Sequence, residues 1–525
     1  MRLVVSPGQP LFTPADRAFL RAVRRLAFAN PFLAERVDAE RAALASDFLE
    51  VDPARSLGTR DENGARIEAL LGALLGGARG RLAAGAGADD EDWALYRDGC
   101  LHFLRSAHEA RFQQLIDGLV ANPALLYRAF LAEYDRLLRF PRSPQGSPEP
   151  ERVFACGFQI QRAKSHIVST LIGASRPAAA LRAAVWQAIF TCDLRDYLAA
   201  PDGCMDDISV LVTGPTGTGK ELVARAIGLS GYIESDPETG RFVAAYDQQL
   251  GSVNLAALPA SLIESELFGH ERGSFTGAVK DHRGWLASCE RGGTLFLDEI
   301  GELDPAIQAK LLRVLETRVF QRLGDLTAQR FAGRIVSATH RDLAAQIAAG
   351  TFRHDLYQRL CACSIRTPSL REQLDDAPDE RRRLVRFIAG KVRARKAEAL
   401  TDQVESWIDS NLPPDYAWPG NVRQLWQCVR EIFVSGSYRP LDLRGSAEGE
   451  DDDPVRSLRE GTLTESEAMD RYITIVHART GGDMAESARV LGVHRHTVAR
   501  RIDHALLARL KGWATRRKGR PAKRR

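Results

Sequence analysis

The sequence predicts a multidomain protein with a helical N-terminal module, a central α/β domain that carries a helical lid, and a small all-α unit near its C-terminal end. Three observations support this fold class. Apolar residues recur with helical spacing through the first 140 residues, short β-branched strands alternate with helices from about 153 to 434, and three short helical segments follow residue 461. A chain of 525 residues is long enough for several domains, each with its own core.

Residues 1–140 form the predicted helical N-terminal module. Thr13, Pro14 and Asp16 have the pattern of a helix start, and apolar residues follow on one face. A stretch rich in Gly and Ala, Gly72 to Asp90, is predicted to be a flexible connection. Neither the β pattern of a phosphate-accepting receiver domain nor that of a common small-ligand sensor domain is present. A regulatory module with an unknown signal and a helical oligomerisation module are equally good interpretations. The proline-rich residues 141–152 are predicted to be a linker.

The central domain is organised around a strand, a glycine-rich turn and a helix. The strand is predicted at Ile208–Val212 and the helix begins near Glu221. This order of elements forms a phosphate-binding loop, because glycines let backbone N–H groups close around phosphate oxygens and a lysine adds positive charge. The expected phosphate-binding residues are Gly214, Pro215, Thr216, Gly217, Thr218, Gly219, Lys220 and Glu221. We expect the α/β core to span 153–360 and the helical lid 361–440.

A second buried strand, Gly293–Asp298, ends in two carboxylates. This arrangement is typical of a Walker B element, in which Asp298 holds Mg²⁺ and Glu299 polarises the attacking water. The two motifs together predict an ATPase whose cofactors are ATP and Mg²⁺.

These motifs resemble those of the sigma-54-dependent transcriptional activators, the bacterial enhancer-binding proteins of the AAA+ family. Gly217–Glu221 matches that family's variant of the phosphate loop, in which Glu follows the lysine. The resemblance spans about Leu171 to Arg430 and includes a signature loop that engages sigma-54. Ser274 stands where the family usually has Ala. The sigma-54 contact residues implied by the resemblance are Gly273, Ser274, Phe275, Thr276, Gly277 and Ala278.

The resemblance also implies roles for further residues. Asn254 matches the switch asparagine that restrains the catalytic Glu299, and Thr339 with His340 matches the nucleotide-sensing position. Arg353 and Arg359 match arginine fingers that act on a neighbouring subunit's nucleotide. Without the family context, ordinary surface ion pairs, such as Arg353 with Asp355, would be the preferred interpretation. In the lid, Arg423 matches the second sensor and reads the γ-phosphate. Two stretches, Tyr232–Gly251 and Asp193–Asp207, are longer than is usual in the family and are predicted to be surface insertions.

The C-terminal part is predicted to bind DNA. An acidic linker, 441–460, precedes a unit at 461–511 that begins with a capping box at Thr464 and resembles a Fis-type helix-turn-helix. Its expected buried residues are Ala485, Ala488, Leu491, Val493, Val498 and Ile502. The basic tail, 512–525, is similar to the core of an AT-hook, although a disordered basic arm that contacts phosphates without reading sequence is the preferred interpretation. The predicted DNA-binding residues are Arg495, His496, Thr497, Arg500, Arg501, Lys518 and Arg520.

Composition places this protein in the cytoplasm. The formal net charge is +4, and basic residues are concentrated in the tail. The 8 cysteines lack paired metal-ligand spacing, as expected of reduced thiols. With no signal peptide and no apolar run of spanning length, we expect a cytoplasmic, nucleoid-associated protein without a membrane partner.

The function implied by the resemblance is sigma-54-dependent activation. The chain would bind enhancer DNA as a dimer, assemble into a hexameric ring, and use ATP hydrolysis to convert the closed complex of sigma-54 RNA polymerase holoenzyme to the open form. Two alternatives are a DNA-binding repressor with an inactive ATPase core and an AAA+ remodeller of another target. Intact motifs at Gly273–Ala278 and Glu299 disfavour the repressor, and the signature loop disfavours the remodeller.

Overall fold

The computed structural model divides into two compact units, Met1–Tyr438 and Arg439–Arg525. It describes residues 10–52, 62–120, 123–140, 147–191, 194–199, 205, 207–245, 250–275, 277–440, 464–503 and 506–507. None of the helices in these ranges combines the length and the apolar character that crossing a membrane requires.

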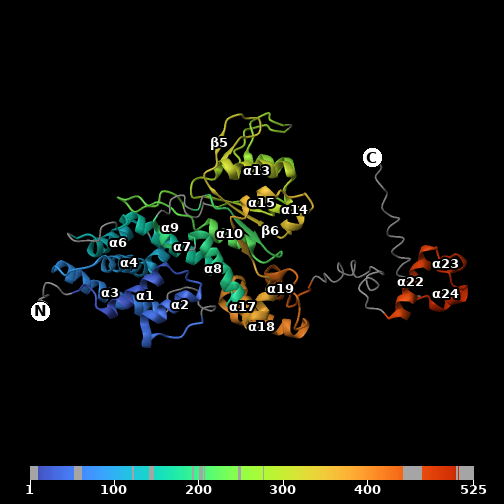
Figure 1. Ribbon diagram of the computed structural model, residues 1–525, viewed down its shortest axis with the longest axis horizontal. Coiled ribbons are helices and arrows are strands. Elements are labelled where there is room, and N and C mark those ends of the chain that lie inside the picture. The colour runs from blue at the N-terminus through green and yellow to red at the C-terminus, as the bar shows by residue number, and fades with distance from the viewer. Residues whose placement is uncertain are drawn as a thin grey trace. The chain divides into compact units, whose positions relative to one another are not determined.

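Six helices form the N-terminal part of the first unit, shown in blue and teal in Figure 1. They are α1 (Pro14–Phe28), α2 (Ala34–Leu44), α3 (Glu62–Ala83), α4 (Asp90–Ala107), α5 (Glu109–Ile116) and α6 (Pro123–Leu138). The predicted start of α1 is confirmed, because the Thr13 hydroxyl and the Asp16 carboxylate form a reciprocal capping box. Leucines and aromatic residues of these helices share one buried core. The helical character of this region is therefore as predicted.

The predicted flexible connection from Gly72 to Asp90 is wrong, because α3 runs through it to Ala83. Buried residues recur along this helix at helical spacing, from Ile67 through Leu71 and Leu75. Gly72 is required for packing rather than flexibility: a Cβ there would lie 2.8 Å from the Phe103 ring. Burial of the leucine stripe offsets the low helix propensity of the glycines.

Helices α7 (Pro150–Thr170) and α8 (Arg176–Phe190) join the N-terminal helices to the central domain (Figure 1). The core was predicted to alternate strands and helices from 153 onward, whereas the described residues from 153 to 199 are mostly helical and contain no strand. α7 begins inside the predicted linker 141–152 and contributes to two cores. Phe154 and Phe158 belong to the N-terminal core, and Ile160 and Ile167 belong to the core beneath the sheet. A short helix, α9 (Leu194–Ala199), follows.

A five-stranded parallel sheet forms the centre of the first unit, in the order β2-β3-β6-β1-β7. Its strands are β1 (Val210–Thr213), β2 (Leu250–Asn254), β3 (Thr294–Asp298), β6 (Arg334–Thr339) and β7 (Cys363–Arg366). Alternate residues face opposite sides: Val210 packs into one core and Leu211 into the other. The helices that cover it are α10 (Lys220–Gly228), α11 (Ala260–Phe268), α12 (Trp285–Ser288), α13 (Pro305–Thr317), α14 (Leu343–Ala348) and α15 (His354–Leu360).

A hairpin and a helical lid complete the unit. The hairpin consists of β4 (Val319–Phe320) and β5 (Gln329–Arg330). The lid has a separate core and contains α16 (Leu370–Asp376), α17 (Glu380–Val392), α18 (Ala397–Asn411) and α19 (Asn421–Ser435). The predicted lid began at residue 361, but β7 still belongs to the sheet, so the lid begins after it.

The second unit contains α22 (Glu465–Arg479), α23 (Met484–Leu491) and α24 (Arg495–Arg501). The capping box at Thr464 is present. Of the predicted buried residues, Val498 is fully buried, whereas the predictions for Ala485 and Val493 are wrong because both are exposed. Ile473 and Ser487 are buried in this unit. Some of the predicted residues stay exposed because so small a unit encloses little volume.

Candidate nucleotide-binding site and partner loop

The phosphate loop connects β1 to α10 at the carboxyl end of the sheet. Gly214, Gly217 and Gly219 have φ angles of 142°, 79° and 93°, which other residues rarely adopt. Gly217 also lies against the lid, where an added Cβ would come within 2.2 Å of the Gly420 carbonyl oxygen. The loop therefore depends on glycine both for its conformation and for the close approach of the lid.

Lys220 begins α10, and its side chain folds back over the loop. Its Nζ donates hydrogen bonds to the carbonyl oxygens of Gly214, at 3.0 Å, and Pro215, at 3.1 Å. Burial lowers the pKa of Lys220, while the charges of Glu299 and Asp298 oppose that shift. This ammonium group is therefore placed so that a bound phosphate would replace the two carbonyl oxygens as its hydrogen-bond partner.

Asp298 and Glu299 end β3 beside the phosphate loop. Burial raises the pKa of Asp298, and the neighbouring charge of Glu299 adds to that shift. Glu299 has a φ of 57°, a conformation that turns its side chain toward the end of β6. There its Oε2 hydrogen-bonds His340, 2.7 Å from Nδ1 and 3.3 Å from the backbone N.

Asn254 lies beside the two carboxylates, and its predicted action on Glu299 stays a prediction. Its Nδ2 donates to Asp298 Oδ2 at 3.4 Å. The strand register explains this contact, because Asn254 of β2 is paired directly with Asp298 of β3. The hydrogen bonds described for the Glu299 carboxylate come from His340.

The predicted sensor residue Thr339 and the two predicted arginine fingers lie in different surroundings. Thr339 is fully buried, and its hydroxyl accepts a hydrogen bond from the Arg341 N–H at 3.0 Å. Arg353 is exposed and forms a two-pronged ion pair with Asp355. Arg359 is also exposed and lies 3.7 Å from Glu316. None of these three side chains lines the cavity described below.

The lid closes over the phosphate loop through α19. The Arg423 N–H donates to the Gly217 carbonyl oxygen at 3.2 Å. Asn421, which was not among the predicted site residues, donates from Nδ2 to the Thr216 carbonyl oxygen at 3.0 Å and accepts from the Leu370 N–H at 2.8 Å. Its φ of 51° is unusual for a residue other than glycine, and its position beside Arg423 is the signal that could have identified it.

A cavity of about 840 Å³ lies between the phosphate loop and the lid. One end carries the loop, Lys220 and the two carboxylates. Apolar side chains at the other end suit a purine base, and they also escaped the sequence prediction. They are Leu171, Ile172, Leu181, Phe387, Ile388 and Trp426. The residues present thus fit a nucleoside triphosphate.

Magnesium fits this site as a partner of both protein and phosphate. The described part of the chain contains no cluster of three or more His, Cys, Asp and Glu side chains that could hold a metal alone. Mg²⁺ commonly binds one or two carboxylates together with substrate phosphates and water, and Asp298 is placed to supply such a carboxylate.

The predicted sigma-54 loop follows α11 and is joined to the β4–β5 hairpin. Backbone hydrogen bonds connect Glu271 and Gly269 with Leu323, each at 2.9 Å. A tight turn closes the loop, with the Gly273 N–H donating to the Ala278 carbonyl oxygen at 2.8 Å. Phe275 is 38% exposed, and Leu326 of the hairpin is 91% exposed. Two exposed apolar residues on connected loops are typical of a binding surface. Thr276 lies outside the described residues.

Residues 198–366 match the family model of the sigma-54 interaction domain. The core of this chain is therefore similar to sigma-54 interaction domains. This finding confirms the resemblance to the sigma-54-dependent activators and, with the parallel sheet and helical lid, an AAA+ ATPase-like fold. The match covers the phosphate loop, both carboxylates, the signature loop and Arg353.

Two curated relatives of this chain are regulatory proteins by name. The chain is 39% identical over 306 residues to the transcriptional regulatory protein ZraR of Klebsiella oxytoca, covering 56% of this chain and 63% of that protein. It is 40% identical over 299 residues to the Nif-specific regulatory protein of Azotobacter vinelandii, covering 56% and 53%. The chain thus spans little more than half the length of these relatives. The crystal structure of NtrX from Brucella abortus in complex with ATP aligns at 24% identity and a TM-score of 0.37, covering 70% of this chain and 77% of that one.

Outside the residues that match the family model, the second unit displays most of the predicted DNA-binding residues. Arg495, His496, Thr497 and Arg500 are exposed on α24. Arg501 is half-buried and lies 3.4 Å from Asp470 of α22. Lys518 and Arg520 lie outside the described residues.

Proposed function

We propose that this protein is a sigma-54-dependent transcriptional activator that hydrolyses ATP to open promoter DNA. The observation that carries the proposal is one cavity that combines a phosphate loop, two carboxylates and a lid arginine, in a domain that also presents the Phe275 loop. Binding, hydrolysis and contact with sigma-54 would then occur in the same domain.

The residues of the cavity have distinct roles in this proposal. Lys220 and the loop amides bind the phosphates, and Arg423 contacts the γ-phosphate from the lid. Mg²⁺ bound beside Asp298 would neutralise phosphate charge. Glu299 orients water for attack once its hydrogen bonds to His340 are broken. His340 therefore keeps Glu299 inactive until the nucleotide is bound.

Assembly into a homo-oligomeric ring would complete the site. Arg353 and Arg359 are exposed and do not line the cavity of their own chain, so they are available to a neighbouring subunit. The pair of Arg353 with Asp355 is exposed to solvent, so it contributes little and is readily exchanged for a phosphate. A hexamer is the ring size implied by the AAA+ resemblance.

The signature loop would transmit hydrolysis to sigma-54. Phe275 and Leu326 present apolar surface from the joined loop and hairpin. We include Leu326 in the contact surface alongside Gly273–Ala278. The Ser274 hydroxyl is buried and has no hydrogen-bond partner in the described structure, so an alanine would fit the same position without that cost.

DNA binding at an enhancer would come from the second unit and the basic tail. The cations of α24 suit phosphates and base edges in a major groove. Exposed apolar side chains of α22 and α23 favour dimer formation: Met469, Tyr472, Met484 and Val490. Such a protein would act in the cytoplasm at the nucleoid.

The test is promoter opening by sigma-54 RNA polymerase in the presence of ATP and the full chain. The variant Glu299→Gln should keep enhancer and ATP binding but lose about 100-fold or more of its ATPase rate and all promoter opening. Glu290→Gln, at an exposed position of the same domain, is the matched control. Opening by Glu299→Gln would contradict the proposed catalytic role. ATP hydrolysis by the wild type without opening would contradict the proposed target, and unaltered repression by Glu299→Gln would favour the repressor.

A further inference from the structure

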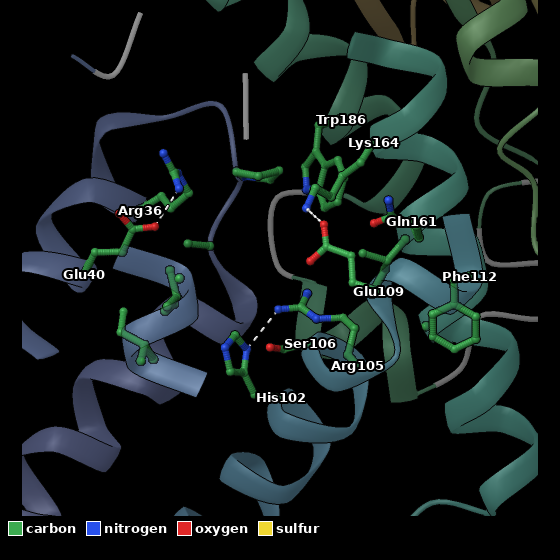
Figure 2. A pocket seen from close by; sticks show the side chains of 17 residues that line it. Arg36, Glu40, His102, Arg105, Ser106, Glu109, Phe112, Gln161, Lys164 and Trp186 are labelled. Carbon is green, nitrogen blue, oxygen red and sulfur yellow. Dashed lines mark hydrogen bonds and ion pairs between the residues drawn. The ribbon is translucent and has the colours of Figure 1, made fainter. Parts of the chain in front are cut away.

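A second cavity, of about 110 Å³, lies where the N-terminal helices meet α7 and α8. It is separate from the nucleotide site and shares no lining residue with it. Figure 2 shows charged side chains of several helices directed into it. His102 and Arg105 come from α4, Glu109 from α5, Lys164 from α7, and Arg36 with Glu40 from α2.

The charges of this cavity are only partly matched. Arg36 pairs with Glu40 at 2.5 Å, and Lys164 pairs with Glu109 at 2.8 Å. Arg105 forms no ion pair with any carboxylate of the described residues. Its guanidinium donates one hydrogen bond, to His102 Nδ1 at 2.9 Å. Three cations, Arg36, Arg105 and Lys164, therefore line the cavity against two carboxylates, and a third carboxylate, Glu68, accepts a hydrogen bond from the lining residue Ser106.

Burial shifts the pKa of three titratable groups in the cavity. Burial lowers the pKa of His102, and the charges of Arg105 and Lys164 lower it further, so the ring stays neutral and accepts from Arg105. Burial lowers the pKa of Lys164 despite its pairing with Glu109, and it also lowers the pKa of Arg105. A further anion between these cations would relieve the cost of burying them.

The remaining walls are apolar and include two aromatic rings. Phe112 and Trp186 line the cavity together with Leu26, Ile67 and Ile160. For scale, an apolar cavity of about 150 Å³ accommodates benzene. At about 110 Å³ this cavity is smaller than that, so it suits an anion smaller than benzene, with one charged group and a short apolar part.

We propose that this cavity binds a small organic anion, a carboxylate or a phosphate monoester, whose charged group pairs with Arg105 and Lys164. The planar guanidinium of Arg105 offers paired N–H donors that match either group. The apolar part of the ligand packs between Phe112 and Trp186. Because α7 and α8 both contact α10, which begins at Lys220, a ligand here lies one helix away from the phosphate loop.

The experiment is isothermal titration calorimetry of the full chain with acetate, propionate and methyl phosphate at constant ionic strength. We expect saturable binding of at least one of these anions and weaker binding of propionamide, the neutral analogue of propionate. Arg105→Gln should weaken that binding by about 10- to 100-fold, because a charge-assisted hydrogen-bonded pair is lost. Arg111→Gln, at an exposed position of α5, is the matched control and should bind as the wild type does.

A second variant protects the test against misfolding of Arg105→Gln. Lys164→Gln removes the other cation and tests the same charge contact. In a separate measurement, Trp186→Phe should abolish any change in fluorescence that ligand binding causes at Trp186. Absence of binding by all three anions, equal binding of propionamide, or unchanged affinity in both charge variants would each overturn the proposal. Because binding is measured without ATP, polymerase or DNA, its failure is distinguishable from failure of the proposed activator function.

Discussion

Phe242 stacks on Phe158 of α7, with ring centroids 4.3 Å apart. Phe242 belongs to the predicted insertion Tyr232–Gly251, between α10 and β2, so an insertion in the ATPase core packs on the N-terminal module. The same loop is held by the Ser235 hydroxyl, which donates to the Glu151 carbonyl oxygen at 3.0 Å. The insertion is therefore a structural connection between the two parts rather than a free surface loop.

Replacing Phe242 by alanine should loosen this connection. The ring is half-buried, so we expect a loss of about 1–3 kcal/mol in the free energy of unfolding, measured by urea denaturation. Val243→Ala, at a neighbouring side chain that is 68% exposed, is the control and should change little. Equal stability of the two variants would show that the aromatic contact contributes nothing.

A fragment that starts at Glu151 should associate in solution. Truncation there removes the N-terminal helices that pack on Phe154 and Phe158, and leaves each ring exposed on α7 except where Phe242 stacks on it. Size-exclusion chromatography should show larger species than for the full chain at equal concentration. The double variant Phe154→Gln, Phe158→Gln of the fragment should restore its solubility. A fragment that behaves as a well-defined, soluble species without these substitutions contradicts the shared role of α7.

Gly217→Ala should abolish nucleotide binding. The residue has a φ of 79°, which costs an alanine about 1–2 kcal/mol, and its Cβ would also collide with the Gly420 carbonyl oxygen. Gly350→Ala is the matched control, because Gly350 has a φ of 72° but open space around its Cα. Fluorescent ATP analogues would measure binding. If both variants lost binding, the cause would be backbone strain at a positive φ rather than the contact with the lid.

Asp325 should stabilise the hairpin beside the signature loop in a pH-dependent way. A hydrogen bond from the Thr327 backbone, followed by one from Arg322, lowers the pKa of Asp325 from 3.8 to about 2. Because the folded pKa is below the unfolded one, the carboxylate contributes stability above pH 3.8, and this contribution is lost as the pH falls toward 2.

The variant Asp325→Asn tests this pH dependence. The difference in unfolding free energy between wild type and variant should be constant above about pH 5 and shrink between about pH 4 and pH 2. Asp281→Asn, in the adjacent loop, serves as a control for general charge effects. A difference that does not vary over this range contradicts the assigned hydrogen bonds.

The sequence alone was enough to predict the features that depend on neighbouring residues. The capping boxes at Thr13 and Thr464 are local, and so are the glycine turn before Lys220 and the strand that ends at Asp298. Each is encoded within a few consecutive residues, where backbone preferences and hydrogen bonding decide the structure. The family resemblance followed from these same short motifs.

Tertiary structure decided which distant residues meet. Gly72–Ala83 is helical because its leucines are buried by other helices, despite glycines that disfavour a helix in isolation. The strand register pairs Asn254 with Asp298, and α7 serves two cores at once. Arg105 faces Lys164 in a cavity because α4 and α7 pack together. No local pattern encodes these contacts, since they depend on how surfaces far apart in the sequence exclude water from one another.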